Sequence, residues 1–202
     1  MASTLGRPKG DKRARTRTRL VQAAAEVIRE KGFERTTLED VAQRAGMTRG
    51  AIYGNFENRD ELFMAVLEAR WEPVIPAFEP GASYARQMRI LADSVVAALP
   101  ARRAAAAGAA SFQLYALTHE AMRLRVVEMN AEIYRRSAEA MLAFIPEQDL
   151  PMPAETFVKV LHGMIDGLVF LRSLTPELVG DEVIYAAFDA LAPGAGGGTA
   201  KA

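Results

Sequence analysis

The sequence contains no cysteine, so neither a disulfide framework nor a zinc–cysteine site is available to it. Its two histidines, His119 and His162, stand too far apart in the sequence to suggest a metal site. No apolar run approaches the roughly 18–20 residues that cross a bilayer, and the first residues lack the apolar core of a secretion signal. We therefore expect a soluble, cytoplasmic protein that binds no membrane, metal or cofactor.

A net charge of one sign is also lacking, because 25 Lys and Arg balance 25 Asp and Glu over the 202 residues. The balance hides an asymmetry along the chain. Up to Arg59 there are 13 basic and 7 acidic residues, a net charge of +6, and the remainder has 12 against 18, a net charge of −6. A basic N-terminal part on an acidic remainder favours contact with a polyanion. A chance cluster of solvated charges is the alternative.

Strand patterns are the third absence. Alanine, leucine, arginine and glutamate dominate, and no β-branched run alternates with period two. An all-α fold is therefore predicted. Residues 1–10 and 193–202 are small, polar and interrupted by glycine and proline, so we expect disordered tails at both ends.

The N-terminal part predicts three helices. The first covers residues 11–31, with Gly32 as its stop. The pattern Thr36-Thr37-Leu38-Glu39 predicts a capping box for a second helix, in which the Thr36 hydroxyl accepts a backbone N–H and Glu39 reaches back. Gly46 then allows a sharp turn, and Thr48 can cap a third helix that runs to about Phe56.

A short helix, a glycine turn and a second short helix are typical of a helix-turn-helix, whose second helix enters the DNA major groove. Thr48 and Arg49 would reach base edges, Gly50 would let the backbone come close, and Tyr53 and Asn55 would suit phosphate oxygens. Further phosphate contacts are predicted for Arg13, Arg15, Thr37 and Arg59, with Arg17 and Arg19 in the same basic series. An ordinary helical hairpin with solvated polar residues is the alternative.

The stretch from about Arg15 to Leu62 resembles the N-terminal domain of the tetracycline-repressor (TetR) family of transcriptional regulators. The matching positions are Gly32-Phe33, Thr36-Thr37, Val41-Ala42, Ala45-Gly46, Thr48-Arg49-Gly50, Ile52-Tyr53, Phe56 and Asp60-Glu61-Leu62. Asn55 stands where the family often has histidine, and Arg59 where it often has lysine. The resemblance implies a homodimer that binds a palindromic double-stranded DNA operator and releases it when a small-molecule effector occupies the second domain.

On this interpretation residues 11–59 form the DNA-binding domain and residues 60–192 a helical domain for ligand binding and dimerisation. Prolines divide the second domain into six predicted helices, over residues 60–78, 83–98, 101–117, 120–145, 154–173 and 177–191. Two apolar stripes with close-packing glycines are the candidate dimer interface: Leu161, Gly163, Ile165, Gly167, Leu168, Ile184 and Phe188. The alternative is that both stripes bury against their own subunit.

Aromatic and methionine side chains are the candidates for an effector pocket, because methionine adapts to varied shapes and tyrosine adds a polar group. They are Trp71, Phe78, Phe112, Tyr115, Met122, Met129, Tyr134, Phe157 and Met164. Asp166 lies within an apolar segment and needs a partner, either Arg172, another base of the chain, or a cationic effector.

The sequence thus predicts a ligand-responsive transcriptional regulator, a repressor rather than an enzyme. It lacks the metalloprotease, serine-hydrolase and phosphate-loop motifs that a helical enzyme could carry. A DNA-binding dimer that responds to no ligand is the second alternative.

Overall fold

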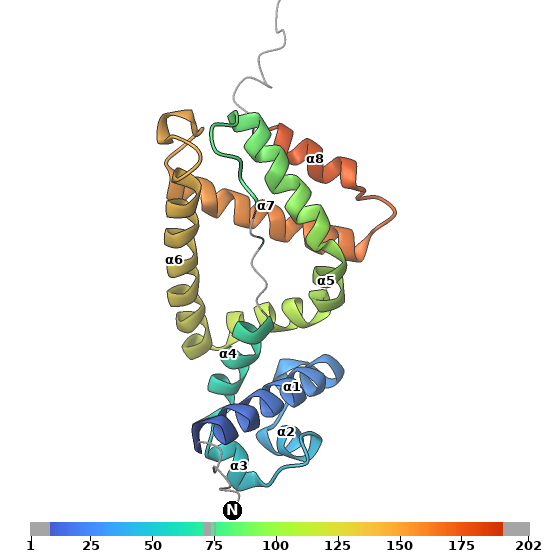
Figure 1. The fold of residues 1–202 in the computed structure, drawn as a ribbon. Helices are drawn as coiled ribbons and strands as arrows, with labels where there is room; N and C mark the ends of the chain where they lie inside the picture. The colour runs from blue at the N-terminus through green and yellow to red at the C-terminus, as the bar shows by residue number, and fades with distance from the viewer. Residues whose placement is uncertain (1–8, 71–73, 75, 192–202) are drawn as a thin grey trace, which may run out of the picture. The chain divides into compact units, whose positions relative to one another are not determined.

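The structure, a computed structural model, describes residues 9–70, 74 and 76–191. Within these residues the secondary structure is helical, as predicted (Figure 1). The elements are α1 (Lys9–Arg35), α2 (Leu38–Arg44), α3 (Arg49–Tyr53), α4 (Arg59–Arg70), α5 (Tyr84–Thr118), α6 (Glu120–Leu142), the 3₁₀ turn η1 (Glu147–Asp149), α7 (Ala154–Leu174) and α8 (Asp181–Asp189). The predicted tails and Trp71 lie outside the described residues, apart from Lys9 and Gly10, which begin α1.

The chain divides into two compact units. The head unit comprises residues 1–72 and 107–122, and the body unit comprises residues 73–106 and 123–202. This division differs from the boundary at residue 60 that the sequence suggested. The head unit includes α4 and the last turns of α5, because their aromatic side chains share a core with α1.

Phe33 is the centre of the head core. Its ring centre lies 4.9 Å from that of Phe63 on α4 and 5.2 Å from that of Phe112 on α5, in edge and tilted arrangements that aromatic rings favour. Gly32 breaks α1 at a φ of +77°, as the sequence predicted for this glycine. The break frees the N–H of Phe33, which donates to the Ser111 hydroxyl at 3.3 Å.

The cap of α2 lies one residue later than predicted. Thr37, not Thr36, is the N-cap: its hydroxyl accepts the Asp40 N–H at 3.1 Å, and the Asp40 carboxylate accepts the Thr37 N–H at 3.2 Å. Thr36 is fully buried and its hydroxyl donates to the Gly32 carbonyl at 2.7 Å. Because Gly32 offers this carbonyl, the first threonine faces the core and the second is left to cap the helix.

Pro100 does not separate two helices as predicted, since α5 continues through it from Tyr84 to Thr118. A proline inside a helix removes one backbone donor, and here the run that follows is rich in alanine, the residue of highest helix propensity. The loss of one hydrogen bond therefore leaves the helix continuous.

The body unit packs around α7, which Figure 1 shows in orange between α5 and α6. Phe157, Ile184 and Phe188 are fully buried in its core. α8 lies beside α5, where the Tyr185 hydroxyl donates to Asp93 at 3.0 Å. Helices α4, α6 and α8 are shorter than predicted, and α8 begins only at Asp181, because residues 175–178 form a turn.

Candidate functional site

The turn between α2 and α3 has the geometry of a tight helix-turn-helix connection. Gly46 takes a φ of +63°, a left-handed conformation that side chains with a β-carbon disfavour. Its N–H donates to the Gln43 carbonyl at 3.1 Å, and the Met47 N–H donates to the Ala42 carbonyl at 2.9 Å, which together form a Schellman motif. A β-carbon at Gly46 would meet nothing within 4 Å, so the backbone conformation, and not space, requires glycine.

The polar side of α3 faces solvent. Thr48 caps the helix, and its hydroxyl accepts a backbone N–H at 3.3 Å. Ile52 is fully buried and fixes the opposite side in the head core. Thr48, Arg49 and Gly50 are exposed, and Tyr53 is 47 % exposed. A recognition helix needs such a face, because its side chains must reach base edges.

Arginines of α1 hold the ends of the two short helices. Arg19 donates to the Ala45 carbonyl at the end of α2, at 3.1 Å. Arg17 and Arg13 donate to the two backbone carbonyls that follow α3, at 3.0 and 3.4 Å. Helix C-termini leave such carbonyls without intrahelical partners and favour cations. These arginines therefore position α3 as well as adding positive charge beside it.

Of the predicted phosphate contacts, Arg13, Arg15 and Thr37 are exposed. The Thr37 hydroxyl is used as an acceptor by the cap of α2, and its own proton remains available to donate. The structure therefore brings an exposed threonine at the start of α2 together with the exposed face of α3 in one unit.

Two of the predicted DNA contacts point inward instead. The Asn55 amide donates to the Ala51 carbonyl at 2.8 Å, and its Oδ1 is buried without a donor among the described residues. Arg59 donates to the Tyr115 hydroxyl at 2.9 Å and to the Glu34 carbonyl at 3.2 Å. Both side chains bond within the head unit in this structure, and their assignment to phosphate contacts stays a prediction.

Glu39 is a residue of this face that the sequence interpretation missed. Its carboxylate lies 2.7 Å from the Arg49 guanidinium and 3.4 Å from the Tyr53 hydroxyl. The Tyr53 hydroxyl and the Glu39 charge both raise the pKa of Arg49. The sequence pattern places Glu39 in the capping box, and the signal for another role is its position on the first turn of α2, next to the N-terminus of α3.

Three of the predicted pocket residues belong to the head core. Phe112, Tyr115 and Met122 are buried there. Burial, followed by the hydrogen bond that the hydroxyl donates to Asp60, raises the pKa of Tyr115. These three side chains therefore pack in the head unit, where the end of α5 meets Phe33, and their place in an effector pocket stays a prediction.

The body unit holds the other described candidates. Phe157 is fully buried in the core, so it offers no exposed surface to an effector in this structure. Phe78, Tyr134 and Met164 are partly buried and pack against this core, and Met129 on α6 is also partly buried. These four remain the aromatic and methionine side chains that could meet a ligand.

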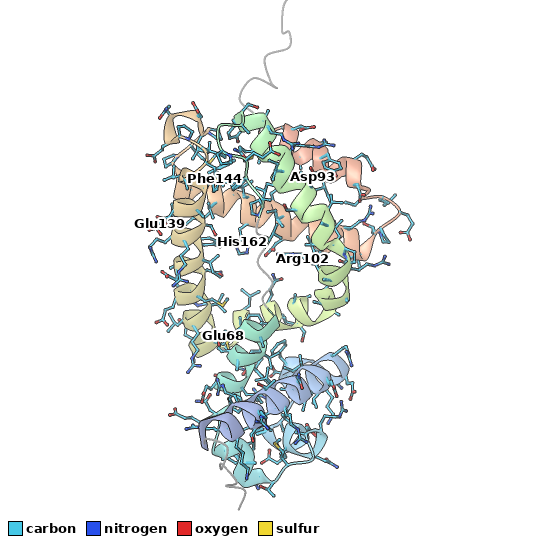
Figure 2. The ribbon with its side chains drawn as sticks, in the orientation of Figure 1. Glu68, Asp93, Arg102, Glu139, Phe144 and His162 are labelled. Carbon is cyan, nitrogen blue, oxygen red and sulfur yellow. The ribbon has the colours of Figure 1, made fainter. Side chains whose placement is uncertain are left out.

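A polar cluster joins α6 and α7 in the body unit. His162, labelled in Figure 2, contacts the Asp166 carboxylate at 3.0 Å and meets the ring of Tyr134 edge to face, with the ring centres 5.3 Å apart. Asp166 thus pairs with a base of the chain, and not with Arg172, which donates to Asp181 at 3.1 Å. The nearby carboxylate contributes, after burial, to raising the pKa of Tyr134.

The predicted dimer residues divide into buried, partly buried and exposed positions. Leu161, Ile184 and Phe188 are buried in the core of their own unit, so they offer no surface to a partner and that part of the prediction is wrong. Ile165 and Leu168 are partly buried. Gly163 and Gly167 are exposed, and a β-carbon at either would meet nothing within 4 Å.

Among the residues that the structure describes, no three acidic, histidine or cysteine side chains gather closely enough to hold a metal ion. None of the described helices is long and apolar enough to cross a bilayer.

Comparison with known proteins agrees with this geometry. Residues 20–66 match the family model described as "Bacterial regulatory proteins, tetR family". The chain is 30 % identical over 165 residues to the HTH-type transcriptional regulator SrpR of Pseudomonas putida, covering 78 % of this chain and 76 % of SrpR. It is 35 % identical over 88 residues to the HTH-type transcriptional repressor BepR of Brucella suis, covering 43 % of this chain and 42 % of BepR.

Among solved structures, a transcriptional regulator from Rhodococcus sp. Rha1 superimposes with a TM-score of 0.63 at 26 % identity, covering 87 % of this chain and 92 % of that one. The relatives are named as transcriptional regulators, and not as enzymes. The chain therefore belongs to the TetR family of bacterial regulatory proteins and is a DNA-binding transcriptional regulator.

Proposed function

We propose that the chain is a repressor that binds a palindromic operator in the cytoplasm as a homodimer and leaves it when a small-molecule effector occupies the body unit. The observation that carries the proposal is the exposed polar face of α3, held by the Gly46 turn. The relative BepR is named a repressor, which supports repression over activation.

The DNA contacts divide into two kinds. Arg49 and Thr48, at the start of α3, read base edges, with the Arg49 guanidinium donating to the two acceptors of a guanine. Arg13, Arg15, Thr37 and Tyr53 contact phosphates, and Gly50 lets the backbone approach. Phosphate contacts add affinity that is blind to sequence and falls with salt.

The dimer contact lies on the exposed side of α7. Val160, Gly163, Gly167 and Leu171 recur at helical spacing and are exposed, as is Leu174 beyond them. Large exposed apolar side chains in one stripe favour a protein contact, and glycines in the stripe let a second helix approach closely. Two copies of this face related by a twofold axis would form the interface.

The effector site lies in the body unit. Arg102 on α5, labelled in Figure 2, buries its Nε without an acceptor among the described residues, and a buried donor without a partner is unfavourable unless a ligand satisfies it. His162, Asp166 and Tyr134 supply further polar groups between α6 and α7. To reverse a 1:99 equilibrium, the effector must favour the released state by about 5.5 kcal/mol.

Selection of duplexes from a random pool tests the DNA-binding mode. We expect two inverted half-sites spaced by roughly 34 Å or a multiple of it, and affinity that falls as salt rises. Arg49→Ala should lose preference among variants of the selected duplex and keep much of its binding to unrelated DNA. A chain that binds no duplex with salt-dependent affinity would refute the proposal.

The dimer and effector assignments need separate measurements. Gly163→Leu has room in its own protomer, so weaker association in sedimentation would report on the partner, and an unchanged dimer would exclude this face. A compound that raises the melting temperature and releases the duplex identifies an effector. If every stabilising compound leaves the duplex bound, the chain is a DNA-binding dimer without ligand response.

A further inference from the structure

Glu39 places a negative charge on the surface that is proposed to face DNA. It is half-exposed on the first turn of α2, and both of the larger side chains of the α3 face converge on it. The Arg49 guanidinium contacts its carboxylate at 2.7 Å, the Tyr53 hydroxyl lies 3.4 Å away, and the guanidinium is 5.6 Å from the centre of the Tyr53 ring. The three form one exposed cluster.

The stability of the head unit does not explain this arrangement. The side chains of Arg49 and Glu39 are 71 % and 50 % exposed, and ion pairs between exposed side chains contribute little to folding. The cap of α2 is already complete without Glu39, because Asp40 and Thr37 form it. The Glu39 carboxylate therefore acts mainly on a molecule that approaches the exposed face of α3.

A carboxylate in this place discriminates between the surfaces of DNA. It is an acceptor only, so phosphate oxygens repel it and the acceptor edges of guanine and thymine leave it without a donor. The cytosine amino group in the major groove is the partner that a Glu side chain accepts from most directly. Arg49 has the opposite preference, because guanine presents two acceptors there.

We propose that Glu39 is a specificity-determining residue of the operator contact. It holds Arg49 away from phosphates on unrelated DNA, and on the operator it accepts a hydrogen bond from a cytosine amino group while Arg49 donates to a guanine. The inference rests on the proposed entry of α3 into the major groove. It predicts an operator half-site with a cytosine and a guanine within reach of α2 and α3.

The test uses the full chain and the duplex that wild type selects from a random pool. Glu39→Gln keeps the size of the side chain and adds donors to it. We expect its affinity for unrelated duplexes to rise several-fold and its salt dependence to steepen by about one phosphate contact, because Arg49 becomes free to meet the backbone. Its base preference should move from cytosine toward adenine, because the Gln amide can accept from and donate to the adenine edge, whereas the Glu carboxylate can only accept.

Glu34→Gln is the matched control. It removes the same charge from the head unit, but the Glu34 carboxylate faces His119 at 4.0 Å and is not paired with Arg49. This variant should raise affinity for all duplexes by one common factor and leave base preference unchanged. In an Arg49→Ala background, Glu39→Gln should no longer steepen the salt dependence, because that effect acts through Arg49.

Two results would overturn the inference. Equal effects of Glu39→Gln and Glu34→Gln would mean that Glu39 contributes charge alone. A lower melting temperature with unchanged base preference would mean that it only stabilises the start of α2. Both leave the proposed DNA-binding mode standing, whereas a wild-type chain that selects no duplex would refute that mode together with this inference.

Discussion

The hydroxyl of Tyr115 links two charged side chains inside the head unit, and its removal gives a quantitative prediction. The hydroxyl donates to Asp60 at 2.8 Å and accepts from Arg59 at 2.9 Å, while the ring is only 3 % exposed. Tyr115→Phe deletes both hydrogen bonds and keeps the ring contacts with Phe33 and Phe63. The variant therefore isolates the hydroxyl from the packing.

The expected loss follows from these contacts. A hydrogen bond to a charged group contributes about 1.5–3 kcal/mol to stability. Asp60 and Arg59 are both partly exposed, so water replaces part of what they lose, and we expect about 2 kcal/mol for the pair of bonds. In a chain of this length, 1 kcal/mol changes the melting temperature by about 2–4 °C, which predicts a decrease of roughly 4–8 °C.

Thermal unfolding followed by circular dichroism measures this change, and Tyr53→Phe is the control. Tyr53 is 47 % exposed and its hydroxyl has one long contact, at 3.4 Å from Glu39, so its removal should cost less than about 0.5 kcal/mol. If both variants melt at the same temperature, the Tyr115 hydroxyl contributes nothing and the reasoning is refuted. In an Asp60→Ala background, Tyr115→Phe should cost less than it does alone.

Three further predictions concern the local structure. Gly46→Ala should destabilise the chain by roughly 1–2 kcal/mol in urea unfolding, because alanine disfavours the left-handed backbone and the β-carbon position is otherwise open. Gly46→Asn should cost less, because asparagine tolerates this conformation better. Equal losses for the two variants would show a steric cause. Thr37→Ala should cost about 0.5–2 kcal/mol by breaking the capping box, and Thr37→Ser should retain most of the stability. Burial raises the pKa of Tyr84 to about 12, so its contribution to stability is complete below pH 10 or so and is lost as the pH rises through 12. The dependence on pH should flatten in Tyr84→Phe, and an unchanged profile would contradict the assignment.

Most of the arrangement of the head unit could be predicted from its sequence, because the residues that determine it lie close together in the chain. A left-handed glycine at position 46 and an inward Ile52 follow from the spacing of small and apolar residues over one turn. The choice between Thr36 and Thr37 as the cap did not follow. Both can cap a helix, and the decision depends on a carbonyl that Gly32 releases by breaking α1.

Long-range packing caused the larger errors. Phe112 and Tyr115 are aromatic, as pocket residues often are. Helical periodicity shows only that one side of the helix is buried, and it does not show whether that side packs in the head unit or in the body unit. The ion pair between Glu39 and Arg49 joins residues ten positions apart on two helices, so it depends on the angle between α2 and α3. The apolar stripes of α7 and α8 indicated burial correctly, yet three of the residues assigned to a partner lie in the unit's own core.

The discontinuity of the head unit constrains how its gene could recombine. Residues 107–122 complete a core that begins with α1, so a single crossover after codon 72 would join this head to a foreign sequence in place of Ser111, Phe112 and Tyr115. The hybrid would inherit the helix-turn-helix with the rings of Phe33 and Phe63 uncovered. Exchange of the body unit between such regulators therefore requires either two crossovers or a donor with matching side chains at these three positions.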